Sequence, residues 1–310
     1  MLSWRKITTP LLWLGLLTPL VFYGSASLRR ASRDAVTQQP LFQGITYSRQ
    51  ITHQSRPQIV HLFDIDLTAP GVKPLATPGY VGADLSKYGL DRQEVLGQTT
   101  SDFLSSHGLQ LAINANFFYK FREVAPWNYY PRPGQTVNLV GIAISDGKLV
   151  SPPSNGLPAL CFIKQQAIID PDGLCPTGTQ QAVAGNLLLL ANGEPTKQIE
   201  KEISHKGNKP YPFTVAALDA TGTRLWLVLA DGKQPLYSEG ITLSEITQLM
   251  QDLGVDTALR LDGGGSTTGV ISTVNGPKIV NNPTQAKIPG RERPIGNHLG
   301  FFARPMKEGQ

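Results

Sequence analysis

Short runs of alternating apolar and polar residues, separated by turn dipeptides, fill most of the chain after residue 56. A period of two is typical of β-strands with one buried face. Pairs such as Asp146-Gly147, Asn192-Gly193 and Asn275-Gly276 are typical of tight hairpins. The pattern therefore predicts a mainly antiparallel sheet with strands over residues 59–67, 109–113, 139–144, 148–150, 187–190, 213–218, 225–229, 268–272 and 279–280.

One segment has the periodicity of a helix instead. Thr242 and Glu245 match a capping box, and Gly254 ends the segment. A weaker helical pattern covers residues 101–106. We therefore expect an α+β fold, in which a few helices pack on a twisted, mainly antiparallel or mixed sheet. The apolar face of the stronger helix consists of Leu243, Ile246, Leu249, Met250 and Leu253.

The amino terminus differs in composition from the rest of the chain. Residues 7–28 carry no charged side chain, and residues 11–23 are almost all apolar. Such a segment is typical of an export signal or a membrane anchor, and the arginines on both sides do not choose between them. We predict a signal peptide or N-terminal membrane anchor over residues 1–30, a polar tether over residues 31–55 and one domain over residues 56–305.

The net charge of +5 comes from the amino terminus. Five of the 28 basic residues precede Asp34, the first acidic residue, so the rest of the chain carries 23 basic against 23 acidic residues. A neutral body gives no indication of a nucleic-acid partner. The five early cations are Arg5, Lys6, Arg29, Arg30 and Arg33.

The chain has two cysteines, Cys161 and Cys175, which bracket one candidate hairpin. In an exported protein we expect them to form a disulfide, which stabilises the fold by on the order of 3 kcal/mol through loop closure. In a cytoplasmic protein they would be two reduced thiols. The five histidines are scattered without the spacing of a metal site. The leader and the cysteine pair together favour an extracytoplasmic location.

Three consecutive glycines form the most distinctive motif, Asp262-Gly263-Gly264-Gly265-Ser266-Thr267-Thr268, directly after the apolar run 257–261. Glycines let the main chain lie close to a ligand, and the free N–H groups, hydroxyls and carboxylate suit an anionic or sugar-like ligand. A glycine-rich turn between two strands would explain the same residues. Thr268 excludes a nucleophile elbow around Ser266 and a dinucleotide fingerprint, because both need glycine at that position.

The glycine motif occurs with four others in the order of a known family. Over roughly residues 105–303 the chain resembles the phosphodiester glycosidases, the family of the lysosomal uncovering enzyme and of many bacterial exopolysaccharide-related proteins. The glycine motif combined with a downstream Glu-Arg-Pro is the specific part of this resemblance. The other four motifs are Ala112-Ile113-Asn114-Ala115-Asn116-Phe117-Phe118, Gly240-Ile241-Thr242-Leu243-Ser244-Glu245, Val280-Asn281-Asn282-Pro283 and Arg291-Glu292-Arg293-Pro294-Ile295.

The resemblance implies cleavage of a sugar 1-phosphodiester, from which a phosphate monoester leaves without much protonation. Asp262 is the first candidate for the nucleophile or for the base that activates water. Glu292 is the second catalytic candidate, and it can pair with an arginine or bind sugar hydroxyls. Arg291 and Arg293 are expected to neutralise the phosphate. Further candidate substrate-binding residues are Asn114, Asn116, Arg260, Gly263, Gly264, Gly265, Ser266, Thr267 and Asn281.

The sequence departs from the family pattern at three places. Phe213 stands where the family usually has an arginine, and Arg260 stands where asparagine is commoner. Arg260 can supply the missing charge if its side chain faces the same cleft. Asn114-Ala115-Asn116 replaces Asn-Gly-Gly. The aromatic-rich loop that follows, over residues 119–130, can stack on sugar rings.

Three functions remain open. The first is a hydrolase that cleaves the glycosidic bond of a sugar 1-phosphodiester in an extracytoplasmic glycan, releasing sugar and phosphomonoester. The second is a non-catalytic glycan-binding or exopolysaccharide assembly module. The third is a phosphodiesterase in which Asp262 and the two asparagines hold a divalent cation, the one cofactor that the residues suggest. The expected partners are a carbohydrate or sugar-phosphate substrate and, if the leader is not cleaved, a membrane.

Overall fold

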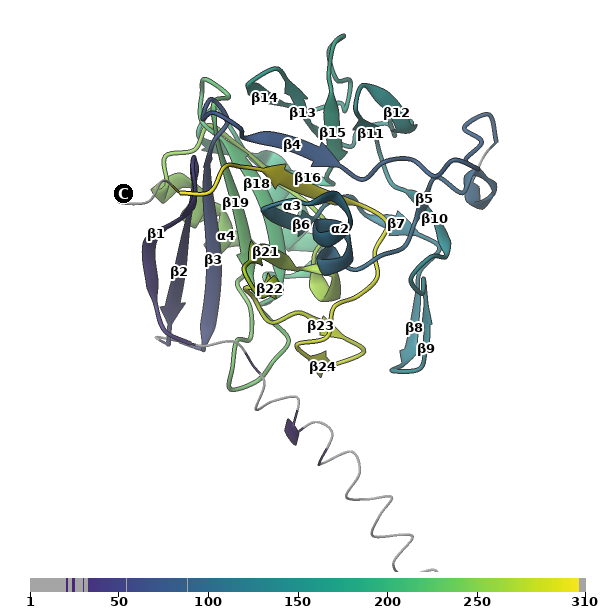
Figure 1. The fold of residues 1–310 in the computed structure, drawn as a ribbon. Helices are drawn as coiled ribbons and strands as arrows, with labels where there is room; N and C mark the ends of the chain where they lie inside the picture. The colour runs from purple at the N-terminus through teal and green to yellow at the C-terminus, as the bar shows by residue number, and fades with distance from the viewer. Residues whose placement is uncertain are drawn as a thin grey trace, which may run out of the picture.

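The computed structural model describes residues 33–306 apart from 54 and 88, together with residues 21, 24, 25 and 30. An eight-stranded sheet packs against two five-stranded sheets, and helices lie on the outer faces (Figure 1). Every ladder between strands in the described part of the chain is antiparallel, as predicted. The balanced α+β class is corrected to a mainly β fold, because strands far outnumber the three α-helices of the described residues.

The eight-stranded sheet collects segments from most of the chain. Its central strands, β19 and β18, form one hairpin, and the amino-terminal strands extend it on one side. In spatial order the strands are β1 (Val36–Phe42), β2 (Ile45–Thr52), β3 (Gln58–Asp66), β19 (Arg224–Ala230), β18 (Phe213–Leu218), β20 (Thr257–Arg260), β16 (Leu187–Ala191) and β17 (Glu194–Pro195).

Two five-stranded sheets form the opposite layer. The first has the order β22 (Gly276–Ile279), β21 (Gly269–Thr273), β6 (Leu111–Asn114), β25 (His298–Phe302) and β4 (Lys73–Ala76). The second has the order β12 (Lys148–Ser151), β11 (Ala143–Ser145), β15 (Gln181–Ala184), β13 (Ala159–Ile163) and β14 (Gln166–Asp170). Smaller sheets join β5 (Val95–Leu96), β10 (Thr136–Leu139) and β7 (Phe118–Tyr119), then β8 (Arg122–Ala125) and β9 (Asn128–Tyr130), then β23 (Thr284–Gln285) and β24 (Ile288–Pro289).

The helices cover both outer faces. α3 (Lys197–Lys206) and α4 (Leu243–Asp252) pack on the eight-stranded sheet, and α2 (Thr100–His107) packs on the sheet that contains β6. Two 3-10 helices cover residues Gly89–Arg92 and Gly264–Ser266. α4 begins with the predicted capping box, since Thr242 and Glu245 each accept a hydrogen bond from the other's backbone N–H. α2 confirms the weaker helical prediction, whereas α3 was not predicted.

Alternate residues of the central strands pack into different layers. In β18, Ala216 and Leu218 belong to the core between the sheets, whereas Val215 and Ala217 pack under α3 and α4. Both faces of this strand are therefore buried, which explains its nearly continuous apolar sequence. The hairpins predicted at residues 213–229 and 268–280 are present with their turns.

The predicted polar tether over residues 31–55 is contradicted by β1 and β2. These strands belong to the eight-stranded sheet, and β2 pairs with β3 over eight residue pairs from Ile45–Ile65 to Thr52–Gln58. Only Ile45 and Tyr47 of β2 are buried, and β1 at the sheet edge is mostly exposed. An edge strand keeps a polar sequence because solvent covers much of it, and the composition therefore resembled that of a tether.

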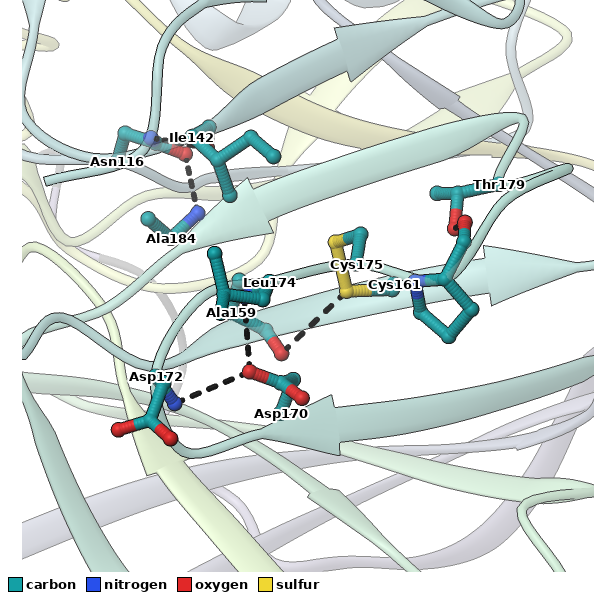
Figure 2. The surroundings of a disulfide bond; sticks show 11 residues. Asn116, Ile142, Ala159, Cys161, Asp170, Asp172, Leu174, Cys175, Thr179 and Ala184 are labelled. Atoms are coloured by element: carbon teal, nitrogen blue, oxygen red, sulfur yellow. Dashed lines mark hydrogen bonds between the residues drawn. A yellow bond between two sulfur atoms is a disulfide. The ribbon is translucent and has the colours of Figure 1, made fainter.

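The single strand predicted over residues 139–144 is also wrong. β10 ends at Leu139 and β11 begins at Ala143, with a break at residues 140–142. Asn116 donates its side-chain N–H groups to the carbonyl oxygen of Val140 at 3.2 Å and to that of Ile142 at 3.1 Å. Figure 2 shows Asn116 beside Ile142. These side-chain hydrogen bonds replace part of the backbone pairing that a continuous strand would have.

The predicted disulfide joins Cys161 of β13 to Cys175, with their Cα atoms 5.7 Å apart (Figure 2). The loop between them is also folded locally. The carboxylate of Asp170 accepts hydrogen bonds from the N–H groups of Asp172 and Leu174, at 3.0 and 2.8 Å. The disulfide therefore links a strand to the end of a turn that is already hydrogen-bonded.

The predicted signal peptide or anchor, residues 1–30, lies almost entirely outside the described residues. None of the helices in the described part of the chain has the length and apolar character needed to cross a membrane. The membrane partner is therefore an expectation from the sequence alone.

Candidate functional site

Asp262 lies where the two layers of the molecule meet. It follows β20 of the eight-stranded sheet, and its backbone is bound to the end of β6 in the opposite layer. Its N–H donates to the carbonyl oxygen of Ala115 at 2.9 Å, and its carbonyl oxygen accepts from Asn114 Nδ2 at 2.5 Å. Both layers therefore fix the position of this carboxylate.

Two adjoining pockets share a wall that consists of Phe117, Tyr211, Asp262 and Gly263. We call them the Arg260 pocket, whose volume is about 460 Å³, and the Arg293 pocket, whose volume is about 380 Å³. Both volumes are in the usual range for small-molecule sites, about 300–1,000 Å³. A ligand that extends through both pockets would pass the Asp262 carboxylate.

The Arg260 pocket is lined by charged side chains beside an aromatic ring. Arg260 donates from Nε to Asn186 Oδ1 and from Nη2 to Glu202 Oε1, both at 2.9 Å. Its guanidinium lies 6.0 Å from the ring centroid of Phe213. Lys206 donates to the same Glu202 oxygen at 3.0 Å. Partial burial raises the pKa of Glu202, but hydrogen bonds from Arg260 and Lys206 outweigh it and hold that pKa below its usual value.

The Arg293 pocket has a different construction. Arg293 donates from Nη1 to Ser266 Oγ at 3.2 Å and from Nη2 to Glu123 Oε2 at 2.8 Å. Its guanidinium also lies 4.6 Å from the ring centroid of Phe121. Glu123 belongs to the β8–β9 hairpin, which projects from the body of the molecule, and Phe121 directly precedes that hairpin (Figure 1). One wall of this pocket is therefore an extended hairpin.

A second cation, Lys233, lies in the Arg293 pocket. Its Nζ donates to the hydroxyl of Tyr211 at 2.9 Å and lies 4.1 Å from the centroid of the same ring. Tyr211 also packs edge-on against Phe213, with ring centroids 6.0 Å apart. The tyrosine therefore connects the aromatic wall of one pocket with a cation of the other.

The glycines of the motif allow the loop to approach these walls closely. Gly264 has a φ of +66°, which residues with a side chain rarely adopt. A Cβ atom at Gly263 would lie 2.8 Å from the carbonyl oxygen of Pro212, and one at Gly265 would collide with the guanidinium of Arg293. The loop therefore needs glycine to bring its backbone beside Asp262 and Arg293.

Burial raises the pKa of Asp262 from 3.8 to about 6. The hydrogen bond from the Ser266 hydroxyl, the charge of Arg293, the N–H of Gly263 and the charge of Lys233 each lower this pKa without offsetting the burial. The carboxyl group is consequently ionised for the most part at neutral pH. A pKa close to the working pH suits a general base.

The structure places Asn114 and Asn116 behind the loop, fully buried. Asn114 Oδ1 accepts from Thr214 Oγ1 at 2.9 Å and from the N–H of Thr268 at 3.1 Å. Asn116 Oδ1 accepts from the N–H of Ala184 at 2.8 Å (Figure 2). Neither asparagine lines the two pockets. Both side chains form hydrogen bonds with neighbouring parts of the protein, mainly with backbone groups. They had been predicted to contact the substrate.

Thr267 and Asn281 are similarly internal. Asn281 Nδ2 donates to the carbonyl oxygen of Thr267 at 3.0 Å and to Asp231 Oδ1 at 3.1 Å, and its Oδ1 accepts from the N–H of Gly269 at 2.9 Å. The hydroxyl oxygens of Thr267 and Thr214 lie 3.3 Å apart. These buried residues hold the glycine loop from the interior of the protein.

Glu292 and Arg291 also lie away from Asp262. The carboxylate of Glu292 accepts from the N–H of Ser101 at 3.0 Å, at the start of α2. Burial raises the pKa of Glu292 above its usual value. Arg291 lies with its guanidinium 5.2 Å from the ring centroid of Tyr129. Neither residue lines the pockets, so Glu292 has the contacts of a helix-capping residue and Arg293 is the arginine at the site.

Pocket residues that were not among the sequence candidates include Glu123, Glu202, Tyr211 and Lys233. Only Glu123 had a signal, because it lies in the aromatic-rich loop over residues 119–130 that was expected to contact a sugar. The others come from segments without a distinctive pattern. They reach the pockets only through the packing of α3, β18 and β19 around β20.

The side chains around Asp262 do not fit the predicted divalent cation. Asn114 and Asn116 direct their oxygens to Thr214, Thr268 and Ala184. No group of three or more histidine, cysteine, aspartate or glutamate side chains with the arrangement of a metal site occurs among the described residues. Cations already surround the carboxylate, and a divalent ion prefers several oxygen ligands.

Comparison with protein families gives a match to the phosphodiester glycosidase family over residues 107–302. No curated protein matches the chain. The matched segment contains both pocket arginines, the glycine loop and Asp262.

Three solved structures have a similar fold. The catalytic domain of zebrafish N-acetylglucosamine-1-phosphodiester alpha-N-acetylglucosaminidase, auto-inhibited by its pro-peptide, has a TM-score of 0.56 and 20% identity, over 89% of this chain and 87% of that one. A putative exported protein from Burkholderia pseudomallei K96243 has a TM-score of 0.53 and 16% identity, over 79% and 74%. A hypothetical protein from Synechocystis has a TM-score of 0.52 and 14% identity over 84% of this chain, which spans 62% of that protein. At these identities the likeness shows a shared fold.

Proposed function

The chain belongs to the phosphodiester glycosidase family, and we propose that it cleaves the glycosidic bond of a sugar 1-phosphodiester with Asp262 as the reacting carboxylate. The strongest support is the position of Asp262 between two pockets of different chemistry. In such a substrate the anomeric carbon lies between a sugar ring and a phosphate. A substrate that extends through both pockets would bring this carbon to the carboxylate.

The Arg293 pocket suits the phosphate. Arg293 and Lys233 line it, and they provide positive charge and hydrogen-bond donors for the phosphate oxygens. The Arg260 pocket suits the sugar, because Phe213 and Tyr211 offer aromatic faces beside polar groups. The substrate is therefore oriented with its phosphate toward the β8–β9 hairpin.

Cleavage breaks the bond between the anomeric carbon and the phosphate oxygen, and the electron pair leaves with the phosphate. Positive charge develops on the sugar in the transition state, where the Asp262 carboxylate stabilises it. Asp262 either attacks the anomeric carbon or takes a proton from the attacking water. Arg293 and Lys233 offset the negative charge that the leaving phosphate gains. The products are a free sugar and a phosphomonoester.

We place this reaction outside the cytoplasm, on an extracytoplasmic glycan. The disulfide between Cys161 and Cys175 supports this location, because such bonds persist in oxidising compartments. The apolar leader supports it independently. Thiol labelling of the exported, denatured and non-reduced protein tests the disulfide, and two labelled cysteines would contradict it.

The deciding experiment is product analysis on a panel of sugar 1-phosphodiesters in ¹⁸O-labelled water. A glycosidase releases reducing sugar that contains ¹⁸O together with unlabelled phosphomonoester. Label in the phosphate, with release of sugar phosphate and an alcohol, would instead indicate a phosphodiesterase. Turnover that a chelator abolishes would contradict a role for Asp262 without a metal. Binding without turnover would indicate a glycan-binding module.

The anomeric configuration of the released sugar separates the two roles of Asp262. Retention indicates that the carboxylate forms a covalent intermediate, whereas inversion indicates that it activates water. NMR spectra recorded within the first minutes of the reaction distinguish these outcomes before the anomers equilibrate.

A further inference from the structure

The Arg260 pocket has more positive charge than a neutral sugar would require. Three cations line it: Lys206, Lys209 and Arg260. Apart from Asp262, which both pockets share, Glu202 is the one acidic residue among the side chains that line this pocket. A neutral sugar would gain little from this excess of cations.

The charge of Lys206 is explained by contacts within the protein, without a ligand. It pairs with Glu202 one turn earlier on α3, and a cation in the last turn of a helix is favourable. Lys209 lies beyond the helix, is exposed, and has no ion-pair partner among the described residues. Its charge therefore has no structural role that the described contacts show.

Arg260 is also unusual because its charge is mostly buried. Its side chain is 12% exposed, and it projects from a strand end above Phe213. Nε and Nη2 are hydrogen-bonded to Asn186 and Glu202, and Nη1 has no hydrogen-bond partner within the described part of the chain. Two fixed contacts orient the guanidinium, and one nitrogen is left for a ligand in the pocket.

We infer that the Arg260 pocket binds a second oxyanion, carried by the sugar itself, through Arg260 and Lys209. The substrate is then a polyanionic glycan whose sugar units bear phosphate or carboxylate groups in addition to the scissile diester. This inference rests on the proposed function, because it assigns the scissile phosphate to the Arg293 pocket. A charge-assisted hydrogen bond from a held guanidinium gives selectivity of about tenfold or more over a neutral sugar.

Binding to a variant that cannot turn over provides the first test. In full-length Asp262→Asn protein, the affinities of glucose, glucose 6-phosphate and glucuronate are measured by calorimetry. We expect at least one anionic sugar to bind about tenfold more tightly than glucose, and the better of the two identifies the anion as phosphate or carboxylate. Equal affinities for all three sugars would overturn the inference.

Variants inside and outside the Arg260 pocket localise the effect. Lys209→Ala in the Asp262→Asn background should remove most of the preference for the anionic sugar, and Arg260→Gln should remove it completely. Lys201→Ala changes an exposed lysine of α3 outside the pocket and should keep the preference. A preference that survives Lys209→Ala and Arg260→Gln in folded protein would place the anion elsewhere and refute the assignment.

Turnover separates this inference from the proposed function. Wild-type protein and Lys209→Ala are compared on two sugar 1-phosphodiesters that differ only in a 6-phosphate on the sugar. We expect Lys209→Ala to lower kcat/KM about tenfold for the 6-phosphorylated substrate and much less for the other. An equal loss for both substrates would mean that the pocket holds the scissile phosphate, against the inference. If neither substrate is cleaved by wild type, the proposed function fails, and the binding preference still decides the question of the second oxyanion.

Discussion

The two pockets beside Asp262 differ in what holds their walls. The Arg260 pocket is bounded by β18, β20 and α3, and its arginine is fixed by Asn186 and Glu202. The Arg293 pocket is bounded by loops and by the β8–β9 hairpin, and Glu123 of that hairpin pairs with the arginine. Both arginines pair with a glutamate, but Glu202 belongs to a helix that packs on the eight-stranded sheet, whereas Glu123 belongs to the projecting hairpin. A competing anion should therefore displace the hairpin more easily than the helix. The comparison suggests a rigid sugar side and an adjustable phosphate side.

The largest expected effect comes from the residue between the pockets. Asp262→Asn keeps the size of the side chain and removes its charge, so turnover should fall by roughly three or more orders of magnitude. Ser266→Ala, measured alongside, should cost less because serine serves only as a hydrogen-bonding group. Single-turnover kinetics on both variants test this ranking. Turnover that persists in Asp262→Asn and disappears in Ser266→Ala would exclude the proposed mechanism.

The next effect separates the two arginines of the carboxy-terminal motif. Arg293→Lys keeps a positive charge but loses the geometry that reaches Ser266 and a phosphate, so kcat/KM should fall by about ten- to a hundredfold. Arg291→Lys is the matched control, since Arg291 packs on Tyr129 outside both pockets and should have little effect. Equal losses in the two variants would show that the arginines act as the paired clamp that the sequence suggested.

The pH dependence tests the carboxylate directly. In the proposed mechanism the reactive form of Asp262 is ionised, and burial raises the pKa of this carboxyl group to about 6. The value of kcat/KM should therefore be constant above pH 7 and fall about tenfold for each pH unit well below 6. A bound phosphate adds negative charge nearby, so the corresponding limb of kcat should lie at higher pH. A limb near pH 4 would show that burial does not raise the pKa of the reacting carboxylate, and activity that rises on acidification would indicate that Asp262 is not the base or nucleophile.

The smallest effect concerns the adjustable wall. Glu123→Gln removes the negative charge that occupies Arg293 while it keeps the hairpin, so a phosphomonoester product should inhibit the variant several-fold more strongly than the wild type. The same change should leave inhibition by a neutral sugar unaltered, which serves as the internal control. If product inhibition stays the same or weakens, the ion pair is a fixed part of the wall and the contrast between the pockets is lost.

The hairpins and α4 could be predicted because their signals are local. A turn dipeptide such as Asp146-Gly147 and the capping box of Thr242 and Glu245 determine conformation over a few residues. β1 at the sheet edge and β2 beside it could not be recognised, since both strands pair through their backbones and keep mostly polar side chains. The balance between helix and strand was misjudged for the same reason.

The residues of the site could likewise be predicted only where their signal is local in the sequence. Asp262 and its glycines form a continuous motif, of which Asp262, Gly263 and Gly265 line the pockets. Asn114 was expected to bind substrate because it belongs to a motif of the family resemblance, but here it satisfies backbone groups of an irregular loop. Tyr211 and Lys233 reach the site from separate segments, so tertiary packing alone brings them together. A single sequence contains no signal for such contacts.

The attachment of Asp262 to both layers makes the site sensitive to how the sheets dock. The residue follows a strand of the eight-stranded sheet, and its N–H and carbonyl groups are bound to the end of β6 in the facing sheet. A small slip between the sheets would move the carboxylate while leaving most of the core buried. The rate of catalysis should therefore depend on how the two facing sheets are aligned. Under increasing denaturant, activity should disappear before the fluorescence of buried Trp226 reports global unfolding.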